Sequence, residues 1–224
     1  PHAMNLNQIV QTISIWILPV LFAVTLHEAA HGYAAKRLGD TTAQMLGRLS
    51  LNPLRHVDPV GTVLVPAVLL LLHTGFLFGW AKPVPVNFNN LRHPRRDMAL
   101  VAAAGPGSNL LMALAWALVA KLGVMLAAGG FGFAVPLALM GEAGIAINLV
   151  LMVLNLLPIP PLDGGRVLSG LVPPLWADRL DRIEPYGLMI LVVLLVSNVL
   201  GHVIYPIIAW LSAIVYGIFG LPVF

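Results

Sequence analysis

Cysteine is absent from the chain, and charged residues make up only 9% of it. Without cysteine there is no disulfide framework and no thiolate ligand, so any metal must be held by His, Asp or Glu. Soluble domains carry roughly 25% charged residues, and a chain with so few cannot cover itself with a polar surface. The sequence also lacks an arginine-rich run or a basic stripe interleaved with aromatics, so nucleic acid is not an expected partner.

Hydrophobic residues account for 59% of the chain, and several apolar stretches approach or exceed the roughly 20 residues needed to cross a bilayer. The lipid bilayer is therefore the expected environment. Residues 1–3, ahead of Met4, are interpreted as a non-native extension. Residues 4–224 are interpreted as a single transmembrane domain.

The apolar pattern predicts an all-α integral membrane protein, a polytopic bundle of five or six segments with short extended segments that dip into the membrane. The predicted membrane segments are residues 9–38, 59–80, 97–121, 136–157 and 186–219. Residues 59–80 either cross or re-enter, and residues 186–219 form one long helix or two spans divided near Gly201. Residues 44–58 are expected to be extended or turn structure beside the membrane. A polar, proline-bearing loop that carries Arg166, Arg179 and Arg182 is expected before the last segment. Because Lys and Arg occur in successive loops, the positive-inside rule does not fix the orientation.

The first segment contains a His-Glu-x-x-His motif formed by His27, Glu28 and His31. Since a helix turns once in 3.6 residues, the two imidazoles lie on one face and can hold a single Zn²⁺. Glu28 is then beside the metal and can accept a proton from the water that the metal activates. The alternative is a set of polar residues packed against helix partners, but an ionisable Glu deep in an apolar span is costly unless it has a function.

A catalytic zinc site of this type needs a third protein ligand and one open position. Asp163 is the best candidate, because it follows a span that is broken by three prolines. Unwound backbone at membrane depth is tolerated only where it is buried in protein or lines a cavity. From spacing alone, Asp163 could instead form a turn or cap the helix that follows.

Three motifs together resemble the site-2 protease family of intramembrane zinc metalloproteases, in its minimal form without a PDZ or regulatory domain. They are the His-Glu-x-x-His motif, the sequence GPGSN at 105–109 and the sequence NLLPIPPLDG at 155–164. The small residues of GPGSN would also let another backbone approach closely. The resemblance implies one zinc ion per chain, held by His27, His31 and Asp163. It also implies that Asn155 contacts the substrate backbone or the developing oxyanion, although an amide in a span could equally join helices.

The predicted substrate contacts are Asn109, Asn155, Val84 and Val86. Family members hold an unwound substrate on an extended segment near the active site, and residues 44–51 or 84–87 could do so by strand addition. The alternative for either segment is an ordinary interfacial loop. The resemblance implies a transmembrane protein as substrate, for example an anti-sigma factor or a remnant signal peptide in regulated proteolysis.

Two other functions are weighed against the protease. A transporter could use the buried His and carboxylate groups as a proton or metal relay, but the chain lacks inverted-repeat symmetry and carries a water-activating base. A catalytically silent relative would not need Glu28. The family resemblance implies the cytoplasmic membrane of a prokaryote. The sequence leaves the assembly state open, a homo-oligomer included.

Overall fold

The computed structural model describes residues 6–65, 68 and 81–222. Within these residues the regular elements are all helical, and four helices are long and apolar enough to cross a membrane. These four are α1 (Leu6–Leu38), α4 (Pro94–Ala128), α5 (Ala134–Asn155) and α8 (Val199–Phe219). The predicted all-helical membrane class is confirmed. The predicted segment at 59–80 begins with a π-helix, η2 (Pro59–Leu64), and otherwise lies almost entirely outside the described residues.

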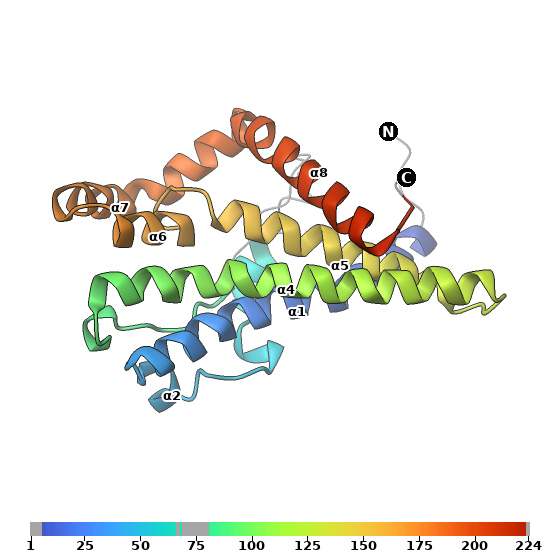
Figure 1. Ribbon diagram of the computed structural model, residues 1–224, viewed down its shortest axis with the longest axis horizontal. Coiled ribbons are helices and arrows are strands. Elements are labelled where there is room, and N and C mark those ends of the chain that lie inside the picture. The colour runs from blue at the N-terminus through green and yellow to red at the C-terminus, as the bar shows by residue number, and fades with distance from the viewer. Residues whose placement is uncertain (1–5, 66–67, 69–80, 223–224) are drawn as a thin grey trace.

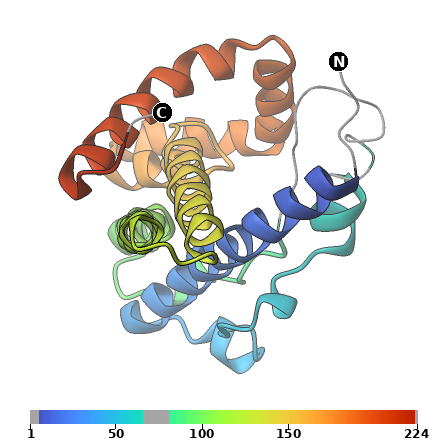
Figure 2. The same ribbon diagram turned by 90° about the vertical axis from the view of Figure 1, so that its right-hand side faces the viewer.

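Helices α1, α4 and α5 form the centre of the molecule (Figures 1 and 2). Small residues let α4 and α5 approach closely, as is common where helices pack in membranes. A β-carbon added at Gly141 on α5 would lie 2.5 Å from the Cα of Ala120 on α4, so only glycine fits there. The buried core of this pair includes Ala113, Ala117 and Leu149.

The chain after α5 folds back over one end of this bundle. It breaks between Asn155 and Asp163, as the prolines predict, and then forms α6 (Asp163–Leu171) and α7 (Pro174–Val196). Residues 166–182, expected as a polar loop, are instead mostly helical, because their charges lie at helical spacing on exposed faces. The last predicted region divides at Asn198, which has a φ of 59°, so α7 and α8 are separate helices.

The segment that follows α1 contains less extended structure than predicted. Residues Thr42–Met45 form the four-residue helix α2, and Pro53–Arg55 form the 3-10 helix η1. The rest of residues 46–58 is turn or irregular backbone. Residues 81–87 are also irregular, and they lead into the 3-10 helix η3 (Phe88–Asn90).

Asp40 holds these connections against the end of α1. Its buried carboxylate accepts hydrogen bonds from the backbone N–H groups of Thr42 (3.0 Å) and Asn87 (2.8 Å) and from the side-chain amide of Asn90 (3.1 Å). Burial acts to raise the pKa of Asp40, but these donors, the Thr42 hydroxyl among them, outweigh it and hold the pKa below its usual value. The anchor fixes residues 81–87 alongside α1.

The fold gathers basic residues at one end of the bundle. The last turn of α1, the beginning of α4, all of α6 and the beginning of α7 lie at this end (Figure 1). Arg92 N–H donates to the Leu38 carbonyl at 3.0 Å, which joins the first two of these. The basic residues on these elements, or just before α4 in the case of Arg92, are Lys36, Arg37, Arg92, Arg95, Arg96, Arg166, Arg179 and Arg182. Because Lys and Arg occur in successive loops, the sequence placed them on opposite sides of the membrane. The antiparallel packing of α1 on α4 instead brings them to the same end of the bundle.

Candidate metal centre

The two histidines of the motif face one another across one turn of α1. Their Nε2 atoms are 3.1 Å apart, and the ring centroids are separated by 4.7 Å with the planes almost perpendicular. His27 is buried, and His31 is largely so. The four-residue spacing therefore produces the expected pair of imidazoles on one helix face.

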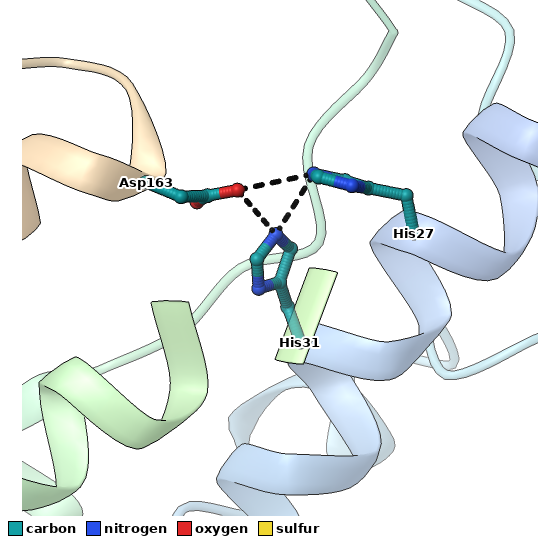
Figure 3. A group of neighbouring side chains, drawn as sticks. All are labelled: His27, His31 and Asp163. Carbon is teal, nitrogen blue, oxygen red and sulfur yellow. Dashed lines mark hydrogen bonds and ion pairs between the residues drawn. The ribbon is translucent and has the colours of Figure 1, made fainter. Parts of the chain in front are cut away.

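Asp163 reaches the same point from the first residue of α6. Its Oδ2 lies 3.2 Å from His27 Nε2 and 3.3 Å from His31 Nε2, and Figure 3 shows the three side chains directed toward one another. Asp163 is 9% exposed. The residue before α6 is Leu162, and no side chain caps this helix. Asp163 therefore does not cap this helix, and that alternative is excluded.

The three atoms fit a zinc ion. Asp163 Oδ2 is buried and, within the part of the chain that the structure describes, has no hydrogen-bond partner. This is costly for a carboxylate oxygen unless a cation neutralises it. Zinc binds His nitrogen and carboxylate oxygen at about 2.0–2.1 Å, so two ligands of a tetrahedron lie about 3.3–3.4 Å apart. The observed separations of 3.1–3.3 Å are close to this edge length. Among the described residues, His27, His31 and Asp163 are the one such group of potential metal ligands.

Glu28 lies next to His27 in the chain, and its carboxylate is held by the segment after the second predicted span. Glu28 Oε2 accepts a hydrogen bond from the backbone N–H of Val84 at 2.8 Å. Pro83 and Pro85 flank Val84 and have no N–H to offer. Val84 is buried, whereas Val86 packs partly buried against Ala35 and its neighbours. The sequence placed Val84 near a substrate, and the structure brings its backbone to Glu28.

Asn109 lies behind His27, fully buried. Its Oδ1 is 2.6 Å from His27 Nδ1, and its Nδ2 donates to the Ala23 carbonyl (3.3 Å) and to Asn148 Oδ1 (2.9 Å). With these groups engaged, the position favours support of His27 over the predicted substrate contact. Asn148 was not among the predicted site residues. Its only signal in the sequence is an amide within an apolar span, which needs a partner.

Comparison with known proteins gives the family. YwhC of Bacillus subtilis, named as a candidate zinc metalloprotease, is 40% identical to the chain over 195 residues, which cover 85% of the chain and 84% of YwhC. The chain belongs to peptidase family M50. The model of this family matches residues 131–198, which include Asp163. The predicted resemblance to site-2 proteases is confirmed, and this M50 peptidase is a zinc metalloprotease of the membrane.

Other M50 relatives match over a similar length. Rip2 of Mycolicibacterium smegmatis, with the same candidate assignment, is 30% identical over 88% of this chain and 74% of its own. Rip2 of Mycobacterium tuberculosis strain H37Rv is 32% identical over 85% of this chain and 70% of its own. No solved structure matches the chain.

Gly105 of the M50 site leaves the space that the two imidazole rings occupy. A β-carbon added there would lie 2.5 Å from Cε1 of His31 and 2.6 Å from Cε1 of His27. The backbone of α4 therefore passes directly against both imidazoles, and any side chain would displace them. The GPGSN sequence was predicted to allow another backbone to approach, and in the structure the two imidazole rings occupy that place.

Asn155 is the last residue of α5 and is partly buried. Its Nδ2 donates to the carbonyl of Leu151 at 3.0 Å, one turn back on the same helix. That bond uses one of the two amide protons. The role of Asn155 toward a substrate stays a prediction.

Proposed function

We propose that this M50 peptidase hydrolyses peptide bonds in or next to the transmembrane segment of membrane-protein substrates, as a step in regulated proteolysis. In this proposal His27, His31 and Asp163 hold one zinc ion per chain. The observation that carries the proposal is the convergence of three ligand atoms, 3.1–3.3 Å apart, between helices of an apolar bundle. The family resemblance favours an anti-sigma factor or a remnant signal peptide as substrate.

Glu28 is the proposed general base. Zinc, when bound, supplies a Lewis acid that polarises the scissile carbonyl and acidifies water. The Glu28 carboxylate takes one proton from the attacking water as the new C–O bond forms. It then passes that proton to the amine nitrogen as the C–N bond of the tetrahedral intermediate breaks. The hydrogen bond from Val84 N–H to Oε2 fixes the rotamer of Glu28 for this transfer. The amide of Asn155 donates to the oxyanion of the tetrahedral intermediate.

The substrate must be unwound at the cleaved bond, because the carbonyl of a helical residue is already hydrogen-bonded within its own helix. The segment at 84–87 is a proposed holder of the unwound strand. It has no regular secondary structure and lies against Glu28. In the described part of the chain the backbone of Val86 has no hydrogen-bond partner, so it is free to pair with an extended peptide.

The test is cleavage of a single-span substrate by the purified enzyme in detergent. We expect mass spectrometry to locate the cut within the apolar segment or at its border. A chelator is expected to stop the reaction, and stoichiometric Zn²⁺ to restore it. The matched control is the same substrate with the small or helix-breaking residues near the cut replaced by leucine, which we expect to be cut at least about tenfold more slowly because unwinding it costs more. Cuts confined to the soluble flanks would contradict the proposal.

We further propose that the enzyme lies in the cytoplasmic membrane of a prokaryote, with the basic end of the bundle in the cytoplasm. Loops on the cytoplasmic side of membrane proteins carry an excess of Lys and Arg. The basic residues of α1, α4, α6 and α7 gather at one end, whereas Lys121, in the last third of α4, stands apart from them. The metal centre would then be reached from the cytoplasmic half of the bilayer.

The absence of cysteine makes this orientation directly measurable. Asn89→Cys places a thiol in η3 at the basic end, and Gly132→Cys places one in the turn between α4 and α5 at the other end. We expect a membrane-impermeant maleimide to label Gly132→Cys on intact cells and Asn89→Cys only after permeabilisation. The reverse pattern would mean that the basic end faces outward.

A further inference from the structure

Two fully buried amides connect the three central helices behind the metal centre. Asn109 on α4 and Asn148 on α5 are both 0% exposed, and Asn109 also contacts α1 through the carbonyl of Ala23. Unpaired amides in an apolar bundle are costly, whereas these two have partners for both their oxygens and nitrogens. A pair of this kind needs an explanation beyond packing, since leucine would fill the same volume.

In this chain of hydrogen bonds, the donor and the acceptor of each bond are fixed. Asn148 Nδ2 lies 2.8 Å from the carbonyl of Gly144, which can only accept, so Asn148 Oδ1 must be the atom that faces Asn109. Asn109 Nδ2 donates to that oxygen at 2.9 Å. Asn109 Oδ1 is therefore the atom 2.6 Å from His27 Nδ1, and Nδ1 must carry the proton of that bond.

This direction decides which nitrogen of His27 is free. A neutral imidazole with its proton on Nδ1 has its lone pair on Nε2, and Nε2 is the atom 3.2 Å from Asp163. His31 is set in the same way, because its Nδ1 lies 2.8 Å from the carbonyl of Val101, which can only accept. Both rings thus present Nε2 to the same point.

We propose that Asn148 and Asn109 are positioning residues for zinc: a chain of hydrogen bonds from the Gly144 carbonyl through both amides fixes the tautomer and orientation of His27. The inference rests on the proposed role of His27 as a ligand. Residues behind a metal-binding histidine commonly set its tautomer in this way. An amide does so without placing a net charge in the apolar core, which a carboxylate would.

Asn148 acts through Asn109. If Asn148 loses its oxygen, Asn109 Nδ2 keeps only its longer hydrogen bond to the Ala23 carbonyl, at 3.3 Å. The Asn109 amide can then give up that bond, rotate by half a turn and present Nδ2 to His27. The proton of His27 would then move to Nε2, and the lone pair needed by zinc would point at Asn109 instead. We therefore predict that replacing Asn148, which lies on α5 and is not a ligand, weakens the binding of zinc.

The experiment compares zinc affinity, measured by competition with a chromophoric chelator in detergent, across matched variants. Loss of a partner behind a ligand typically weakens metal binding by about 10–100-fold, and we expect this for Asn148→Leu. Asn148→Asp should stay within about threefold of wild type, since a protonated carboxyl can donate to Gly144 and accept from Asn109. Ser197→Ala removes a 3.2 Å hydrogen bond to the Leu194 carbonyl at the exposed end of α7 and should leave affinity unchanged.

A second readout separates positioning from folding. In metal-free enzyme, histidine-selective ¹⁵N spectra should show His27 protonated on Nδ1 in wild type and Asn148→Asp, and a mixture of tautomers in Asn148→Leu. Wild-type affinity and an Nδ1-protonated His27 in Asn148→Leu would overturn the inference. An affinity loss that follows only the melting temperature of the metal-free protein, and is not rescued by Asn148→Asp, would also overturn it. His27→Ala is the reference: if it keeps stoichiometric zinc, His27 is not a ligand, and the inference is overturned together with the ligand assignment.

Discussion

Replacing Glu28 with glutamine is expected to abolish peptide hydrolysis while zinc stays bound. Glutamine has the same shape, and its Oε1 can still accept the hydrogen bond from Val84 N–H. It cannot accept a proton from water at neutral pH, so the step that a general base performs is lost. General bases contribute about 10²–10⁴-fold to rate, and we expect kcat to fall by at least that range.

The measurement is single-turnover cleavage of the transmembrane substrate together with zinc content per chain. Glu142→Gln makes the same chemical change on α5 outside the metal centre, and it should leave both quantities unchanged. If Glu28→Gln cleaves within about tenfold of wild type, another residue is the base. If it loses zinc as well, Glu28 supports the metal and the rate says nothing about proton transfer.

Part of this site follows directly from local sequence. The four-residue spacing of His27 and His31 fixes their separation once the segment is a helix, and the apolar run guarantees the helix. The proline break before Asp163 also follows locally, because proline cannot continue a helix. That Asp163 then meets the two histidines is a long-range fact. The broken span made Asp163 the best candidate for the third ligand, and the family resemblance supplied the ligand role itself.

The contacts that hold the site residues in place could not be predicted from local sequence. The hydrogen bond from Val84 to Glu28 uses a backbone N–H, which every residue but proline has, so the sequence carries no mark of it. Asn148 is one amide in an apolar helix, and its partner depends on how α4 packs on α5. Gly105 was recognised as a place of close approach, but what approaches it, the two imidazole rings, emerged only in three dimensions.

The positions of the charged residues were also not enough to predict local structure. Arg179 and Arg182 were assigned to a loop because charged residues and prolines cluster there. Their three-residue spacing is equally that of one exposed helix face, and Pro174 sits at the first position of α7, where proline is well tolerated. The sequence could not choose between loop and helix without knowing that α6 and α7 pack together. Their contacts include an ion pair between Arg166 and Glu184 at 3.2 Å.

Replacing Asp163 with alanine is expected to weaken zinc binding by on the order of 10²–10³-fold. Four-ligand zinc sites bind with about 10–16 kcal/mol, so one ligand accounts for roughly 3–4 kcal/mol, and each 1.4 kcal/mol is tenfold. The melting temperature should depend on the metal state. Zinc should raise it strongly in wild type, by mass action on the folded state, and clearly less in Asp163→Ala, because about 3–4 kcal/mol of that stabilisation is lost.

Without metal, the variant should melt no lower than wild type. Asp163 Oδ2 is buried without a hydrogen-bond donor from the described residues, and it lies within 3.3 Å of two imidazole nitrogens. With the proton of each ring on Nδ1, as inferred above, the lone pairs of both Nε2 atoms face that oxygen. Removing that oxygen takes away repulsion and an unpaired buried charge, not a favourable contact. Asp178→Asn, an exposed carboxylate on α7, is the control and should change neither zinc affinity nor melting. If metal-free Asp163→Ala instead melts far below wild type, Asp163 is a structural partner of the histidines, and the geometry in Figure 3 is an ion pair that needs no cation.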